Sequence, residues 1–412
     1  MQRIRMLPLE KSAQKYALPI RIHASGKYLE DQAGTPFFWH GDTSWKLFWD
    51  FTLEEAETYL RDRARQGFTV IQVQLLPHRA YQANRNGDEA FLTRGDLQLP
   101  NPRYFAHVDR VLEAAKEHGV LLLVSPAWLS GWEQDWHLYY TVPNAVSFAG
   151  FLTERYGDNP QILGWIHGGD DDALELHEAV RAGAMVFKKN APRQLNTFHA
   201  WVKGGWVFFK DEPWYDFCMA YAYSYPEFLR QIEAAQGCCP QKPLVLGETH
   251  YEGNANIDSG ILRKYAYTSV ILGGAGHTYG HKDIWCKTYF WSEALCSEAS
   301  HHMRALKDLF GGLPWHTLAA AQDADAVCAW GEWVEKTAYP TARMAGGGIA
   351  YLYGNVQVKL PAWAKGHALR WVDPVSGRAY AQPPAQDMVV KVPGMNAAGA
   401  EDWVLLLEEG QG

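Results

Sequence analysis

The chain has 412 residues, of which 47% are hydrophobic, and this is enough for one large domain and a smaller second domain. Its net charge is -8, and it has no run of lysine or arginine that could neutralise a row of phosphates, so we expect no nucleic-acid partner. No apolar stretch reaches the roughly 20 residues that span a bilayer, so we expect no membrane partner either.

The first 21 residues are charged and interrupted by prolines, and they lack the continuous apolar core of a secretory signal. We interpret residues 1–21 as an N-terminal extension and expect a cytoplasmic protein. The six cysteines agree with this location, because their spacing fits no ribbon or finger. Even the adjacent Cys238 and Cys239 are expected to be free thiols.

Apolar runs alternate with amphipathic segments from residue 36 to residue 310. Each run is a predicted β-strand: 37–42, 69–76, 120–128, 162–170, 195–200, 217–224, 243–250 and 274–280. The segments between them have helix signals, such as Thr52 followed three residues later by Glu55, except after the fifth strand, where a loop is expected. Eight such units predict an α/β fold, a (β/α)₈ TIM barrel over residues 22–314.

An open doubly wound sheet is the alternative architecture, and it would need a glycine-rich phosphate loop after a strand. The sequence has no such loop, and we expect no cofactor. After residue 314, short apolar segments are separated by Gly, Pro and Asp-Pro turn signals. This change predicts a small C-terminal antiparallel β-sandwich over residues 315–412.

Three consecutive aspartates follow the fourth predicted strand, which ends in Gly168 and Gly169. The glycine pair allows a sharp turn, so Asp170 is expected at the mouth of the barrel, where the active sites of such barrels lie. Asp171 or Asp172 is expected to cap the next helix. Asp170 is therefore the first candidate catalytic residue.

Glu248 is the second candidate, because it ends the seventh predicted strand and has no helix to cap immediately. Glutamate is rare in a core unless it is paired, so a salt bridge at the barrel mouth is the structural alternative. Strands four and seven face each other across a barrel. Two carboxyl groups that flank a bond are the working parts of a glycosidase, in which one donates a proton and the other attacks or activates water.

The other strand ends carry aromatic and polar side chains of the kind that bind sugars, and the whole chain has 18 Trp, 21 Tyr and 17 Phe. The predicted substrate-binding residues are His40, Asp42, Trp45, Gln74, Trp128, His199, Tyr223, His250 and Trp285. The histidines leave open a metal-dependent hydrolase on the same barrel. The first strand reads "WHGDT" and not H-x-H, however, and H-E-x-x-H is absent, so we expect no metal ligands.

Three long segments resemble the apiosidase-like glycoside hydrolases, family 140. They are "GTPFFWHGDTSWKLFWDFTLEEAETYLRDRARQGFTVIQVQ", "RYGDNPQILGWIHGGD" and "KPLVLGETHYEG", and the tail "LRWVDPVSGRAY" is similar to the β-sandwich of collagen-binding type that often follows that barrel. The resemblance covers roughly residues 22 to 408. The family pattern GEP-x-YE appears here as "GETHYE", with Thr249 in place of proline.

The resemblance implies an aspartate acid/base after strand four and a glutamate nucleophile after strand seven, which fall on Asp170 and Glu248. It implies an exo-acting, retaining glycoside hydrolase whose carbohydrate substrate is an apiose-bearing or other glycoside from plant or pectin oligosaccharides. A non-catalytic carbohydrate-binding barrel and the metal-dependent hydrolase are the alternatives. The sequence leaves both a monomer and a homo-oligomer open.

Overall fold

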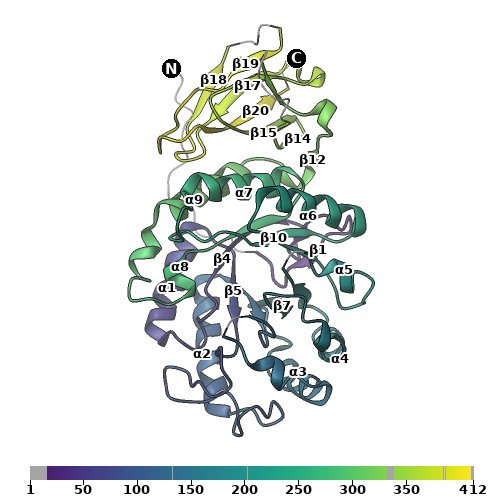
Figure 1. Cartoon of the computed structure of the whole chain (residues 1–412), viewed down its shortest axis with the longest axis vertical. Coiled ribbons are helices and arrows are strands. Elements are labelled where there is room, and N and C mark those ends of the chain that lie inside the picture. The colour runs from purple at the N-terminus through teal and green to yellow at the C-terminus, as the bar shows by residue number, and fades with distance from the viewer. Residues whose placement is uncertain are drawn as a thin grey trace. The chain divides into compact units, whose positions relative to one another are not determined.

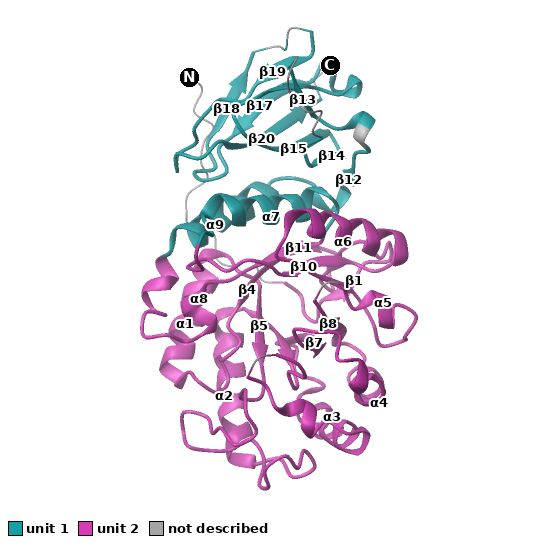
Figure 2. Ribbon diagram, viewed as in Figure 1, with its two compact units in different colours: residues 1–12, 256–274, 297–412 teal, residues 13–255, 275–296 magenta. Residues whose placement is uncertain are grey.

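The structure is a computed structural model, and it describes residues 16–131, 133–201, 203–331, 338–383, 385 and 387–409. Its contacts divide the described chain into two compact units (Figure 2). The barrel unit comprises residues up to 255 and residues 275–296, and the C-terminal unit comprises residues 256–274 and 297 onwards. None of the described helices is both long and apolar enough to cross a membrane.

The barrel unit is built on eight parallel strands in the order β8-β7-β6-β5-β4-β11-β10-β9 (Figure 1). They are β4 (Trp39–Thr43), β5 (Val70–Gln74), β6 (Leu121–Ser125), β7 (Ile162–Gly168), β8 (Leu195–His199), β9 (Cys218–Tyr221), β10 (Leu244–Glu248) and β11 (Gly276–Tyr279). The two edge strands of this order, β8 and β9, meet and bring the sheet round into a barrel. The N–H of Asp216, just before β9, donates to the carbonyl oxygen of Asn196 in β8 at 2.8 Å. The predicted TIM barrel and all eight of its strands are confirmed.

Helices follow the strands. The helices of the barrel unit are α1 (Leu53–Gln66), α2 (Pro102–His118), α3 (Val142–Tyr156), α4 (His177–Asn190), α5 (Trp206–Phe209), α6 (Tyr225–Cys238) and α8 (Lys282–Trp285). Of these, α1, α2, α3 and α6 begin at side-chain caps. Thr52 and Glu55 form the predicted capping box at the start of α1, and Gly67 ends the helix in a left-handed conformation. The expected loop after the fifth strand contains only the single turn of α5.

A short antiparallel sheet closes the end of the barrel at which its strands begin. It consists of β1 (Arg21–Ile22), β2 (Leu29–Glu30) and β3 (Pro36–Phe37), none of which the sequence analysis separated from its neighbours. Leu29 and Phe37 are fully buried in one cluster with Trp39, Val70 and Leu121, the first residues of three barrel strands. The sheet therefore seals one end with apolar side chains and leaves the other end for polar chemistry.

The C-terminal unit contains two antiparallel sheets, of order β12-β14-β15-β20-β17-β18 and β13-β16-β19, together with α7 (Ser259–Ile271) and α9 (Glu298–Gly311). The strands are β12 (Ala319–Ala320), β13 (Cys328–Trp330), β14 (Thr341–Met344), β15 (Gly347–Tyr353), β16 (Gln357–Lys359), β17 (Ala368–Val372), β18 (Ala379–Gln382), β19 (Val389–Lys391) and β20 (Asp402–Glu408). Val358 of one sheet and Leu405 of the other share one core. The predicted antiparallel β-structure after residue 314 is confirmed.

In the C-terminal unit, Arg263 of α7 is completely buried and bonds both carboxylate oxygens of Asp402, at 2.8 and 2.6 Å.

The adjacent Cys238 and Cys239 of the barrel unit are both free thiols, as expected from the sequence.

Candidate active site

Asp170 lies two residues beyond the end of β7. Gly168 has a φ of 93°, and a Cβ atom there would lie 2.4 Å from the carbonyl oxygen of His199, so the chain can turn here only with glycine. The N–H of Asp170 then donates to the carbonyl oxygen of Ser130 at 3.1 Å. The glycine pair therefore makes the sharp turn that the sequence predicts and directs Asp170 to the carboxyl end of the strands.

The other two aspartates have local contacts, but neither caps α4 as expected. Asp171 accepts a hydrogen bond at 2.8 Å from the backbone N–H two residues later, and Asp172 forms an ion pair of 3.5 Å with Lys203. Helix α4 begins only at His177 and has no side-chain cap. The expectation was wrong because a 3₁₀ turn, Leu174–Leu176, separates the acidic run from the helix.

Glu248 is the last residue of β10, and only 6% of it is exposed. Its Oε1 atom accepts a hydrogen bond of 3.1 Å from the hydroxyl of Tyr223, and its Oε2 atom lies 3.1 Å from Nε2 of His199. The other ring nitrogen, Nδ1 of His199, lies 2.9 Å from the carbonyl oxygen of Gly169. Because carbonyl and carboxylate oxygens only accept hydrogen bonds, both ring nitrogens carry protons in this arrangement.

The imidazolium form of His199 agrees with its electrostatic surroundings. Burial lowers the pKa of His199, but the hydrogen bond to Glu248 and the negative charges of Glu248 and Asp170 raise it, and the net change is upward. The protonated ring of His199 therefore forms an ion pair with Glu248 at 3.1 Å.

Asp170 has the opposite environment. Burial raises the pKa of Asp170 from 3.8 to about 6, and the negative charge of Glu248 contributes to the rise. The charge of His199 and hydrogen bonds from Trp128 and from Tyr221, whose hydroxyl is 3.5 Å away, oppose it. Asp170 is thus disposed to hold a proton, whereas Glu248 is bonded by His199 and Tyr223, and such different surroundings give paired carboxyl groups different roles.

Aromatic rings surround His199, which bonds Glu248, and shield it from solvent. The ring centroid of His199 lies 4.8 Å from that of Trp128 and 4.6 Å from that of Tyr221. Trp45 lies 4.7 Å from Trp128, and its indole N–H donates to the hydroxyl of Tyr251 at 3.2 Å. The structure therefore brings the predicted residues Trp45, Trp128 and His199 together with both carboxyl groups.

Two aromatic residues near the carboxyl groups were not among the predicted substrate-binding residues. Tyr221 is the last residue of β9, and Trp201 follows β8 by two residues. The ring of Trp201 lies 6.3 Å from that of Tyr221 and 6.4 Å from that of Tyr223, and 44% of this tryptophan is exposed. The same signal, an aromatic residue at a strand end, could have identified both.

Three of the predicted residues lie around this centre without touching either carboxyl group in a described contact. Gln74 ends β5, is buried, and donates its backbone N–H to the carbonyl oxygen of Trp45 at 2.9 Å. The ring of His250 lies 5.4 Å from that of Tyr223, and that of Trp285 lies 5.6 Å from that of Tyr251. Their role in binding substrate stays a prediction.

His40 and Asp42 lie elsewhere, on the helix-facing side of β4. Asp42 accepts a hydrogen bond of 2.8 Å from Tyr59 and pairs with Arg63 at 3.5 Å, both on α1. His40 bonds His277 of β11 through Nδ1 and Nε2 at 3.0 Å. Successive strand residues point to opposite faces, and Trp39 belongs to the inner cluster, so the two even-numbered residues point away from Asp170 and Glu248.

The buried histidines are divided among separate partners. His167 bonds the side-chain oxygen of Asn196 at 3.1 Å, His40 pairs with His277, and His199 pairs with Glu248. In the residues that the structure describes, no three histidine, cysteine or carboxylate side chains form a group that could hold a metal ion.

A family model and several solved structures are similar to this chain. The family model "Apiosidase-like, catalytic domain" matches residues 23–317. A solved structure described as a glycoside hydrolase is 26% identical, covers 95% of this chain and 97% of its own, and has a TM-score of 0.81. No curated protein matches the chain.

Two further structures share the fold. A glycoside hydrolase family 5 protein from Bacteroides vulgatus ATCC 8482 is 23% identical over 95% of this chain and 93% of its own, with a TM-score of 0.83. The endo-β-1,4-mannanase from Thermotoga petrophila is 13% identical over 90% of this chain and 91% of its own, with a TM-score of 0.52. In both, the similarity extends over nearly the whole length of the two chains.

Proposed function

The chain belongs to the apiosidase-like family and is a glycoside hydrolase, and from this premise we propose a specific reaction. It removes a terminal sugar, apiose or another glycosyl residue, from plant-derived or pectin-derived oligosaccharides with retention of the anomeric configuration. The observation that supports this proposal is the contrast between Asp170, whose pKa is raised to about 6, and Glu248, which is paired with a buried imidazolium.

In the first step, the protonated carboxyl group of Asp170 donates its proton to the glycosidic oxygen, and the bond from that oxygen to the anomeric carbon breaks. The carboxylate of Glu248 attacks the same carbon and forms a glycosyl ester. Tyr223 and His199 hold the two oxygens of Glu248 by hydrogen bonds, which orients the nucleophile before attack.

In the second step, the carboxylate of Asp170 removes a proton from water, and the water oxygen bonds to the anomeric carbon. The ester bond to Glu248 breaks, the sugar leaves with retained configuration, and Asp170 is again protonated. The pKa of about 6 suits a group that must give a proton in one step and take one in the next.

The test is hydrolysis of a panel of aryl glycosides and pectin-derived oligosaccharides by the wild type, Asp170→Asn and Glu248→Gln, each with and without EDTA. We expect both variants to lose at least about two orders of magnitude in kcat/KM, the low end for acid–base catalysis. The matched control is Asp172→Asn, which neutralises a neighbouring aspartate that pairs with Lys203 and should keep wild-type activity.

Nuclear magnetic resonance of the first-formed product then decides the stereochemistry, since a retaining enzyme releases the anomer of the substrate's own configuration. Loss of activity in EDTA would indicate the metal-dependent hydrolase. Binding of oligosaccharides without cleavage by the wild type would indicate the carbohydrate-binding barrel.

A further inference from the structure

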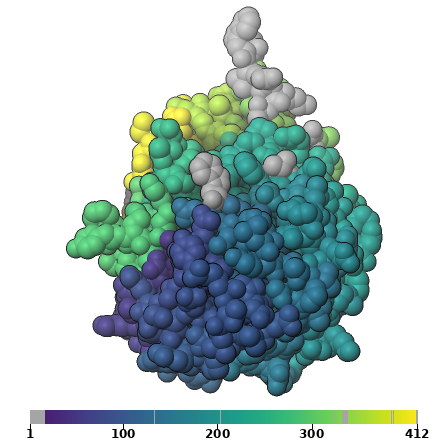
Figure 3. Space-filling view, turned by 60° about the horizontal axis from the view of Figure 1, so that its bottom comes forward, coloured from purple at the N-terminus to yellow at the C-terminus, as the bar shows by residue number. Residues whose placement is uncertain are grey.

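A second concave site lies in the barrel unit, away from the contacts that surround Asp170 and Glu248. It is a pocket of about 630 Å³, a size typical of sites for small ligands. Its walls come from the loop after β4, the long connection between β5 and α2, and the loop after β6, all at the carboxyl ends of barrel strands. The blue segments that include the β5–α2 connection form much of the face turned toward the viewer in Figure 3.

Two buried hydrogen-bond donors in the wall of this pocket have no described partner. Trp49 and Asn84 are each 5% exposed, and neither the indole N–H of Trp49 nor the Nδ2 atom of Asn84 has an acceptor among the described residues. The Oδ1 atom of Asn84 accepts from the backbone N–H groups of Asn86 and Asp88 at 3.0 and 3.1 Å, which fixes the orientation of the amide. Buried donors without partners are costly, and a ligand with acceptor oxygens would remove that cost.

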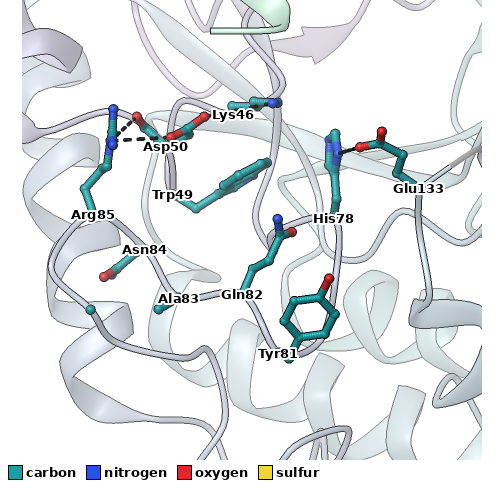
Figure 4. Close-up of a pocket in the computed structure, with 11 residues that line it drawn as sticks. Lys46, Trp49, Asp50, His78, Tyr81, Gln82, Ala83, Asn84, Arg85 and Glu133 are labelled. Carbon is teal, nitrogen blue, oxygen red and sulfur yellow. Dashed lines mark hydrogen bonds and ion pairs between the residues drawn. The ribbon is translucent and has the colours of Figure 1, made fainter.

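A third donor is a lysine whose ion pair is loose. Lys46 Nζ lies 3.9 Å from Asp50, longer than a hydrogen bond, whereas Arg85 approaches the same carboxylate at 3.4 Å and donates to the backbone oxygen of Asp50 at 2.9 Å. Figure 4 shows Arg85 and Asp50 paired on one side, with Lys46 directed toward the middle of the view. The ammonium group can therefore turn to an oxygen of a bound molecule.

The pocket also offers aromatic surface. Tyr81 is 55% exposed, and Figure 4 shows its ring below His78, at the end of the pocket far from Lys46. The ring of His78 lies 5.1 Å from that of Trp49, and burial together with the charge of Lys46 lowers the pKa of His78 to about 4, so this histidine is neutral at physiological pH. A ligand with one apolar face and several oxygen acceptors fits these walls, and a sugar ring has both properties.

The pocket is connected to the candidate active site through two loops. Lys46 immediately follows Trp45, which packs on Trp128 in the catalytic group. In the loop after β6, a Cβ atom on Gly131 would lie 2.7 Å from an oxygen of Asp170, and Glu133, two residues later, reaches His78 at 3.6 Å. One loop therefore touches both sites.

We propose that this pocket binds a second glycosyl unit of the substrate, distinct from the sugar that is cleaved, through Trp49, Asn84 and Lys46 as hydrogen-bond donors and Tyr81 as the stacking surface. The proposal rests on the proposed glycosidase function. It makes the enzyme selective for oligosaccharides over monoglycosides, because only a longer substrate occupies both sites at once.

The test measures kcat/KM of each variant on two substrates. One is the p-nitrophenyl glycoside of the sugar that the wild type releases, and the other is the oligosaccharide from which that sugar is released. Asn84→Asp removes the amide donor but keeps the oxygen that orders the loop, and Tyr81→Ala removes an exposed ring, so both variants should fold. We expect each to lower kcat/KM about fivefold to tenfold on the oligosaccharide and to leave the p-nitrophenyl glycoside unchanged. Tyr289→Ala, an 88% exposed tyrosine outside the pocket, is the matched control.

Binding to the Glu248→Gln variant separates this proposal from the proposed function. Calorimetric titration with neutral oligosaccharides and with oligogalacturonides should show weaker binding when Tyr81→Ala or Asn84→Asp is added, whether or not the wild type cleaves those compounds. Equal losses on both kinetic substrates, or unchanged oligosaccharide binding, would overturn the second glycosyl site. Failure of the wild type to cleave any glycoside would overturn only the proposed reaction.

Discussion

The substitution Asp170→Asn is expected to abolish activity and at the same time to make the protein more stable at neutral pH. Above pH 6 the wild-type side chain is a partly buried carboxylate that is repelled by Glu248. Asparagine has nearly the same shape and keeps an oxygen to accept the hydrogen bond from Tyr221, but it carries no charge. The variant therefore lacks the proposed acid. It also lacks the free-energy cost of holding a charged carboxylate at this position.

The size of the effect follows from the pKa of Asp170. A rise from 3.8 to about 6 corresponds to about 3 kcal/mol, because each pKa unit is worth about 1.36 kcal/mol. In the unfolded chain the proton leaves near pH 3.8, and in the folded protein it stays until about pH 6. The folded protein thus binds more protons within this window, so its free energy of unfolding falls as the pH rises through it. The gain from asparagine is at most about 3 kcal/mol and is largest above pH 6.

The assay is urea denaturation of the wild type and Asp170→Asn at pH 4, 6 and 7.5. The free energy of unfolding of Asp170→Asn should exceed that of the wild type at pH 7.5, and the difference should shrink toward pH 4. A destabilised Asp170→Asn at pH 7.5, or a difference that does not change with pH, would refute the reasoning that Asp170 is a partly buried carboxylate beside a like charge.

The remaining predictions concern other parts of the site and the C-terminal unit. In wild type, kcat/KM should decline on the alkaline side with a midpoint near pH 6, since Asp170 must be protonated to act as acid, and a pH–rate profile without this limb would contradict that role. His199→Asn should lower kcat by about two orders of magnitude with little change in the circular dichroism spectrum, because Glu248 loses its cation. Gly168→Ala should reduce both activity and melting temperature, since the added Cβ meets backbone at 2.4 Å. Arg263→Met should destabilise the protein by about 3–5 kcal/mol in chemical denaturation, by leaving a buried carboxylate unpaired, without affecting activity.

Much of the barrel could be predicted because its information is local. A parallel strand buried on both faces is a continuous apolar run, and residues such as Thr52 and Gly67 mark the two ends of a helix. The eight apolar runs therefore predicted the strands, and the positions of the strand ends predicted Asp170 and Glu248 as candidate residues. The short sheet β1–β3 was missed because its strands have only two residues each and show no hydrophobic period of their own.

The sequence by itself determined the strand order along the chain and the two carboxyl groups, since these depend on residue type and position within a strand. Only the tertiary structure decided which side of β4 faces the barrel axis, and this moved His40 and Asp42 to the helix layer. It also decided the hydrogen-bond partners of His199 and the different surroundings of the two carboxyl groups, because hydrogen bonds and burial depend on residues far apart in the chain. The pocket beside Trp49 and Asn84 also depends on the tertiary structure. Three separate loops form its walls, and the side-chain N–H donors of Trp49 and Asn84 have no partner among the described residues.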